Sequence, residues 1–173
     1  MTFFKMTHRQ QKPRSKQQGI ALVEFTLIAT FLLFLLIGIM EMARLMYSMQ
    51  SLSEMTRRGA RLAAVCYVSD QSDIPALNSI VNIAPKGFLP QHLIIEYLDA
   101  DGVAISGDLT TNTNFAQIRF VSARIDAFNY QLLIPFVTLN LTDFVPSFQT
   151  IIPAESLGVL RPTSSNPTAI TNC

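Results

Sequence analysis

The side chains that could act as nucleophiles, proton carriers or metal ligands are few and scattered in this sequence. Cys66 and Cys173 are the only cysteines, and they form no CxxC pair. His92 is the only histidine after residue 19, so a Ser-His-Asp triad in that part of the chain would have to use it, and no GxSxG segment accompanies it. Zinc needs three or four ligands, and one histidine with two distant cysteines is a poor set. The sequence therefore predicts no enzyme: no catalytic residue, no metal site, no cofactor and no small-molecule substrate.

One short acidic segment needs separate treatment. The residues Asp99-Ala100-Asp101-Gly102 are similar to the start of a calcium-binding loop. The spacing that follows does not fit an EF-hand, because no glutamate closes the loop. A plain Asp-Gly turn is the favoured interpretation, and calcium binding near Asp99 and Asp101 is the alternative.

A single carboxylate, Glu24, lies in a long apolar run. Residues 20–40 carry no other charge, and at 1.5 Å per residue this run spans about 32 Å, which is enough for the hydrocarbon core of a bilayer. A charged group at the centre of a membrane helix costs about 2.5–3.5 kcal/mol, and less near its end. Glu24 either reaches the headgroups or has a positively charged partner, and the second interpretation makes it a functional residue.

The charges around the run predict its orientation. Hydrophobic residues make up 49% of the chain and charged residues 14%, and all the charges in residues 1–19 are basic. The positive-inside rule then places the N-terminus in the cytoplasm and the rest outside the inner membrane, in the periplasm. The part after the run is acidic, which argues against nucleic acid as a partner. A cleaved signal peptide is disfavoured, because the run is long and no A-x-A pattern follows it.

The start of the run resembles a prepilin peptidase site. Such a site has a glycine before the cut, an apolar first mature residue and a glutamate five residues after the glycine, as in Gly19, Ile20 and Glu24 here, with Phe25 next. The resemblance implies cleavage between Gly19 and Ile20 on the cytoplasmic side. It also implies that Glu24 faces a freed α-amino group during docking, and an ammonium would make a buried carboxylate tolerable.

Three segments in order resemble the TadE-like proteins, minor pilin-like components of tight-adherence (Flp-type) pilus systems. They are Ala21-Leu22-Val23-Glu24-Phe25, Gly38-Ile39-Met40-Glu41-Met42-Ala43-Arg44 and Thr56-Arg57-Arg58-Gly59-Ala60-Arg61-Leu62-Ala63-Ala64. The resemblance covers about residues 18–66. It implies a minor pilin or pseudopilin with prepilin peptidase, the inner membrane and other major and minor pilins as partners, acting in assembly or at the pilus tip.

Two other functions stay open at this point. A minor pseudopilin of a type II secretion machine would carry the same processing site. A membrane-anchored sensor or binding module in the periplasm that is never cut would need the apolar run but not the processing site. The mass of the mature N-terminus separates this last class from the pilins.

The elements that must position these residues follow from periodicity. We expect a cytoplasmic leader at residues 1–19, a long helix at 20–66 with a transmembrane first half, and an extracytoplasmic pilin-like domain at 67–173. The apolar stripe of the helix includes methionines 42, 46, 49 and 55. A short helix is expected at 74–82, capped by Asp73, and strands at 93–98, 115–128 and 147–152. Residues 132–141 form a further apolar segment. The predicted fold class is α+β, one long helix against a small antiparallel sheet.

The predicted periplasmic location of the domain bears on its two cysteines. Cys66 falls at the expected end of the long helix, and Cys173 ends a tail with little apolar content. Disulfides form and persist in the oxidising periplasm. We therefore predict a bond between Cys66 and Cys173, and the alternative is a buried Cys66 with a free terminal thiol.

Overall fold

The structure is a computed structural model that describes residues 17–132, 138–140, 148–161 and 169–173. The chain divides into two compact units, residues 1–42 and 43–173, which are described separately. The apolar segment predicted at 132–141 lies largely outside the described residues. The predicted boundaries after residues 19 and 66 stay a prediction.

The first unit consists of the N-terminal part of helix α1 (Gln17–Val65). Its apolar side chains are exposed, as Leu27 and Phe31 illustrate at 70% and 69%. The most apolar stretch has a mean hydropathy of 2.6, and none of it is buried. Among the described residues this is the one helix long and apolar enough to cross a membrane, judged by length and composition.

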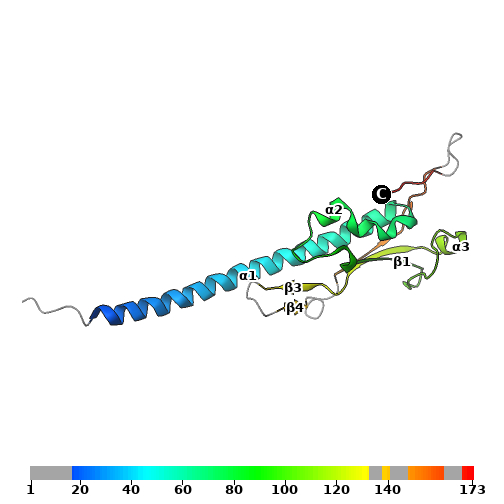
Figure 1. Cartoon of the computed structure of the whole chain (residues 1–173). Helices are drawn as coiled ribbons and strands as arrows, with labels where there is room; N and C mark the ends of the chain where they lie inside the picture. The colour runs from blue at the N-terminus through cyan, green and yellow to red at the C-terminus, as the bar shows by residue number, and fades with distance from the viewer. Residues whose placement is uncertain (1–16, 133–137, 141–147, 162–168) are drawn as a thin grey trace, which may run out of the picture. The chain divides into compact units, whose positions relative to one another are not determined.

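The second unit is built on a three-stranded antiparallel sheet of β1 (Leu93–Leu98), β2 (Phe120–Ile125) and β5 (Gln149–Pro153). The strand order is β1-β2-β5, so β2 is central. The prediction at 93–98 is confirmed residue for residue, and the other two strands lie within two residues of their predicted ranges or inside them. The α+β class is confirmed, with β1 beside the C-terminal part of α1 in Figure 1.

Small residues let α1 approach the sheet closely. A Cβ atom added at Gly59 would lie 3.1 Å from Leu93 Cδ2 and 3.6 Å from Ala123 Cβ. Ala60 and Ala63 are fully buried beside it. At the β5 side, the hydroxyls of Thr56 and Thr150 are 2.9 Å apart. Because side chains from both sheet edges and the centre contact one helix face, the core forms between α1 and the sheet.

The methionine stripe is only half as predicted. Met55 is fully buried and Met49 packs against the core, whereas Met42 and Met46 are 56% and 59% exposed. The helix turns by 100° per residue, so a contact face that follows Met49, Leu52 and Met55 leaves position 46 outside it. The prediction that these methionines mostly face the core therefore holds for Met49 and Met55 and not for Met42 and Met46.

The C-terminal end of α1 is capped by groups from distant parts of the chain. The last carbonyls of a helix have no partner within it. Here the carbonyl of Ala64 accepts a hydrogen bond from Leu157 N at 3.0 Å. The carbonyl of Ala63 accepts one from the Tyr97 hydroxyl at 3.1 Å. The helix can therefore end at Val65 inside the folded domain without unsatisfied acceptors at these two positions.

Because Tyr97 is a titratable group that donates to this cap, the stability of the domain should depend on pH in the alkaline range. Its burial raises the pKa of the Tyr97 hydroxyl to about 12. A raised pKa means that the neutral form is favoured in the folded state, so this stability is present below pH 10 and is lost as the pH rises towards 12. We expect Tyr97→Phe to lose about 1–3 kcal/mol at neutral pH, because Ala63 O loses its donor.

The measurement for Tyr97→Phe is the unfolding free energy from pH 8 to 12. The wild-type protein should lose stability between pH 10 and 12 relative to the variant, so the two curves should converge there. Tyr47, which is 64% exposed, gives the control Tyr47→Phe, which should leave both the neutral value and the alkaline slope unchanged. Parallel curves for Tyr97→Phe and the wild type would contradict the assignment.

The short helices differ from prediction. The helix expected at 74–82 is two pieces, η3 (Ile74–Ala76) and α2 (Asn78–Val81), because Leu77 between them is extended with ψ 141°. Asp73 makes no side-chain cap. The segment β3 (Asn129–Gln131), paired with β4 (Thr138–Asn140), was not predicted. The remaining short helices are η2 (Val68–Ser72), η4 (Pro90–His92) and α3 (Asn112–Phe115).

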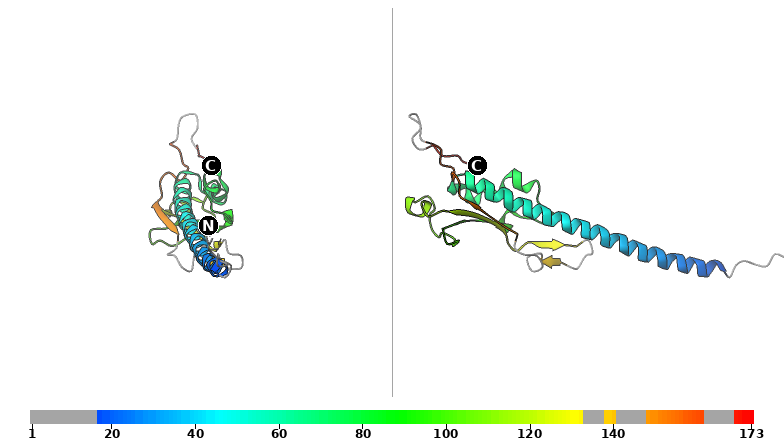
Figure 2. Two further views of the ribbon diagram at one scale, coloured as in Figure 1. Left: turned by 90° about the vertical axis from the view of Figure 1, so that its left-hand side faces the viewer. Right: turned by 180° about the vertical axis from the view of Figure 1, so that it is seen from behind.

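These short elements cover the α1 helix and one edge of the sheet. The Ser51 hydroxyl donates to the carbonyl of Ile83, and Arg58 Nη1 donates to that of Ser79 at 3.1 Å. Gln71 Nε2 donates to the carbonyl of Ile95 at 2.6 Å, which occupies an acceptor on the outer side of β1. The β1 edge is therefore partly protected, as exposed edge strands commonly are. Figure 2 shows α2 and the sheet around the second half of α1.

Candidate functional site

The residues of the predicted processing site all lie in the first turns of α1. Ile20 and Phe25 are 73% and 70% exposed. A Cβ atom added at Gly19 would meet no atom within 4 Å, and the backbone there is helical. Nothing in the described part of the chain therefore requires a glycine at position 19, where alanine would stabilise the helix.

Glu24 is exposed on the same helical segment. The neighbouring polar side chains are satisfied locally, since Thr26 Oγ1 donates to Leu22 O at 2.9 Å and Thr30 Oγ1 to Thr26 O at 2.7 Å. A threonine hydroxyl can use its own helix in this way, whereas a carboxylate has no donor to reach there. Among the described residues no hydrogen bond or ion pair holds Glu24, so its charge is available to a partner.

A disulfide joins Cys66 to Cys173 in the structure, with a Cα–Cα separation of 5.7 Å. Cys66 is fully buried directly after α1. Backbone contacts hold the same tail, because Tyr67 N donates to Thr171 O at 2.9 Å and Cys173 N to Asp70 Oδ2 at 2.7 Å. The C-terminal segment is thus tied to the end of α1 and the residues just after it by one covalent bond and by two hydrogen bonds.

Removing the disulfide should destabilise the second unit. Closing a loop of about 108 residues lowers the entropy of the unfolded chain by up to about 4.7 kcal/mol on the chain-entropy model, and measured values are typically 2–4 kcal/mol. We expect Cys173→Ser to lower the midpoint of thermal unfolding by about 5–15 °C. The variant that lacks both cysteines should lose no more than Cys66→Ser alone. The bond itself is checked by alkylating protein that has been exported to the periplasm, without prior reduction. Labelling of two thiols would contradict the disulfide.

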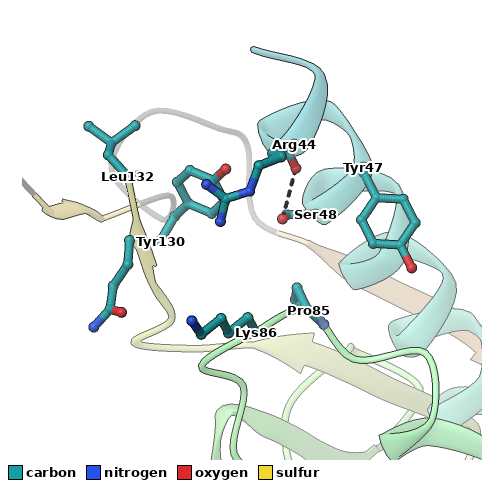
Figure 3. Close-up of a pocket in the computed structure, with 8 residues that line it drawn as sticks. Arg44, Tyr47, Ser48, Pro85, Lys86, Tyr130 and Leu132 are labelled. Carbon is teal, nitrogen blue, oxygen red and sulfur yellow. Dashed lines mark hydrogen bonds between the residues drawn. The ribbon is translucent and has the colours of Figure 1, made fainter. Parts of the chain in front are cut away.

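A pocket of about 330 Å³ lies between α1, the loop after α2 and strand β3 (Figure 3). The guanidinium carbon of Arg44 is 5.9 Å from the centre of the Tyr130 ring, within the range of a cation–π contact. Ser48 Oγ donates to the carbonyl of Arg44 at 3.0 Å. The lining residues are Arg44, Tyr47, Ser48, Pro85, Lys86, Tyr130, Gln131 and Leu132.

This pocket offers basic and aromatic side chains to a ligand. Its lining has two cations and no carboxylate, histidine or cysteine. Sequence reasoning missed this pocket, because its walls come from segments that are about 40 residues apart or more and because β3 was not predicted. Its only signal in the sequence was the isolated basic residue Arg44 after the apolar run.

His92 and the Asp99–Gly102 turn have structural roles. The Nδ1 atom of His92 accepts a hydrogen bond from Leu89 N at 3.0 Å, and its ring packs edge-on against Phe88 and Phe128. Asp99 Oδ1 accepts hydrogen bonds from Asp101 N and Val103 N, both at 2.9 Å. Within the described residues, no three His, Cys, Asp or Glu side chains are placed to hold a metal ion.

Comparison with known proteins gives one match. No curated protein and no solved structure matches this chain. Residues 19–61 match the family model TadE, described as TadE-like protein. The match begins at Gly19 and extends through Glu24 to Arg61, so it covers the predicted processing site and most of the second half of α1. The resemblance seen in the sequence is thereby confirmed: this chain has a TadE-like segment at residues 19–61.

Proposed function

We propose that this chain is a minor pilin or pseudopilin of a tight-adherence pilus. In this proposal, prepilin peptidase cuts it after Gly19, residues 20–40 hold it in the inner membrane, and the domain at 67–173 lies in the periplasm. The chain then joins other major and minor pilins and acts in pilus assembly or at the tip, without an enzymatic activity of its own.

The observation that carries the proposal is the combination of the family match with the surroundings of Gly19. The match starts at this residue. The fold offers no reason for a glycine there, because a side chain would meet open space. A peptidase that must bind an extended or closely approached backbone on the amino side of the bond does offer a reason.

Glu24 has a defined part in the proposed assembly. Cleavage would free the α-amino group of Ile20, which is protonated near neutral pH. The exposed carboxylate of Glu24 is the matching charge, and within a bilayer the two ions stabilise each other because neither is hydrated. This pairing would place an incoming subunit against the one before it.

The test is the mass of the mature N-terminus. With its cognate prepilin peptidase, the protein should lose residues 1–19 and begin at Ile20. Gly19→Leu should remain at full length. Gly38→Leu is the matched control, because Gly38 lies in the same helix and also has no neighbour within 4 Å, and it should be cut normally.

Two results would end this proposal. One is a mature protein that keeps residue 1, or that is cut near residue 48. The other is normal cleavage of Gly19→Leu in the presence of the peptidase. Because both glycines have open surroundings, a difference between the two variants cannot come from a loss of folding.

A further inference from the structure

A groove lies on the β5 side of the domain, where the end of α1 meets the outer strand. It encloses about 460 Å³ and is lined by Arg61, Ala64, Val65, Ile152, Pro153 and Glu155. Val65 is 43% exposed at its wall, and Ile151, on the same strand, is 52% exposed. The groove thus has an apolar floor with one basic and one acidic residue at its rim.

The adjoining edge of the sheet is open. Ile125 N donates to Phe148 O and Ala154 N to Arg119 O, so even-numbered residues of β5 are bonded to β2. The N–H and C=O groups of Ile151 therefore point away from the sheet, and no protein group bonds to them in the described part of the chain. Figure 2 (left) shows β5 in orange at this lateral edge.

The exposed face of α1 above the groove is basic. Arg57 and Arg61 are exposed and make no hydrogen bond or ion pair among the described residues, whereas Arg58 is bound to Glu54 at 2.8 Å. Two acids stand against the three arginines of this face: Glu54, which interacts electrostatically with all three, and Glu155 in the groove. The groove and its surroundings therefore carry a net positive charge.

A complementary surface lies at the opposite edge of the sheet. The turn after β1 carries Asp99 and Asp101, and no basic residue occurs between positions 97 and 118. Val103 in this turn is 61% exposed. The turn is held in shape by Asp99 N, which donates to Val103 O at 3.0 Å, and by Gly102 with φ +79°. It therefore presents one exposed apolar side chain next to two acidic residues on a preformed loop.

We propose that the acidic turn 99–103 of one copy of this chain docks in the α1–β5 groove of the next copy. Val103 enters the apolar floor between Val65 and Ile152, and Asp101 lies against Arg61. The turn follows β1 and the groove flanks β5, which are the two outer strands of the sheet. The two surfaces share no residue, so such a head-to-tail contact can join successive copies, in a ring or in an open chain depending on the rotation between them.

This contact deepens the proposed function, because it rests on a chain that works as a subunit of an assembly and names a second copy as one partner. Its geometry does not involve Gly19, Glu24 or the membrane-spanning residues. The contact can therefore be tested on the uncleaved full chain, independently of processing and of pilus formation.

The experiment uses the full-length protein in detergent micelles, with a photoreactive benzophenone amino acid in place of Val103. Irradiation should give covalent dimers whose cross-linked peptides contain residues 61–65 or 151–155. The same probe at Val81, which is 42% exposed on α2, is the matched control and should give about tenfold less dimer.

Charge variants sharpen the result. Arg61→Glu should lower the dimer yield about tenfold, because it removes one charge pair and adds a repulsion. Glu155→Gln should raise the yield, since it removes the only acid from the groove. Asp101→Arg in the probe-bearing copy should restore dimers with Arg61→Glu in the other. These positions are exposed, so circular dichroism should show an unchanged fold.

The proposal is overturned by cross-links that map elsewhere, by monomers alone, or by yields that do not respond to Arg61→Glu and Glu155→Gln. Cross-linking at the groove in a chain that prepilin peptidase never cuts would remove the pilin function and leave the contact standing. Normal cleavage and piliation without this cross-link would overturn the contact and leave the pilin function standing.

Discussion

The variant Glu24→Ala should insert into the membrane and be cut after Gly19, and yet fail to enter the pilus. Insertion should be as good as in the wild type or better, because a carboxylate in a membrane helix carries a cost that alanine lacks. Incorporation should be lost, because the α-amino group of the neighbouring subunit would then have no counter-charge in a medium that cannot hydrate it. The measurement compares membrane-bound and pilus-bound protein after pili are sheared from cells.

Two further variants separate charge from shape. Glu24→Gln keeps the size of the side chain and removes the charge, so it should fail like alanine. Glu24→Asp keeps the charge on a shorter side chain, so it should retain part of the incorporation. Normal piliation by a cleaved Glu24→Ala protein would show that the carboxylate is not a docking charge, while the cleavage site itself would remain valid.

Gly158→Ala should be among the most destabilising single substitutions in the domain. Gly158 has φ +74°, and an added Cβ atom would lie 2.3 Å from Tyr67 N and 2.4 Å from Tyr67 Cα. Both obstacles are backbone, so no side-chain rotation relieves them. The preceding Leu157 also has a positive φ, +46°, and donates its N–H to Ala64 O. We expect a loss of about 3 kcal/mol or more.

Gly87→Ala is the matched control for Gly158→Ala. Gly87 has φ +90° but no atom within 4 Å of the added Cβ, so its replacement costs only the backbone strain, about 1–2 kcal/mol. Urea unfolding followed by circular dichroism gives both values. Equal losses for the two variants would mean that the close approach of Gly158 to Tyr67 does not exist in solution.

The local elements could be predicted because their signals are local. The apolar run and the helical spacing after it predicted α1 to within three residues at its N-terminal end and one at its C-terminal end. Alternation of apolar residues predicted β1 residue for residue and placed β2 within a longer candidate strand. Each of these patterns records a repeat of 3.6 or 2 residues along one segment, and no other part of the chain is needed to read it.

The length of β2 and the division of the helix expected at 74–82 could not be predicted from such local patterns. The strand expected at 115–128 was shortened to Phe120–Ile125 because α3 takes residues 112–115 and because β1 pairs with only six residues. Leu77 has good helix propensity and is nevertheless extended. Leu77 packs against the core, and tertiary packing overrides a helix propensity of a few tenths of a kcal/mol.

The predicted processing site rests on a pattern that the sequence carries by itself. The spacing from Gly19 to Glu24, the basic residues before it and the apolar residues after it are properties of one continuous segment. What the structure adds there is the absence of any neighbour around Gly19, which leaves the fold without a need for glycine. In the proposed function, Gly19 and Glu24 act on molecules outside the chain.

Only the tertiary structure decided how the distant parts of the domain meet. Tyr97 and Leu157 cap the last carbonyls of α1, and Gly158 passes against Tyr67. The pocket beside Arg44 and the groove beside Arg61 have walls from segments that are remote in sequence. A periodic pattern states which face of an element is buried but not which side chain it will meet. That depends on the volumes and hydrogen-bonding groups of all the packed elements together.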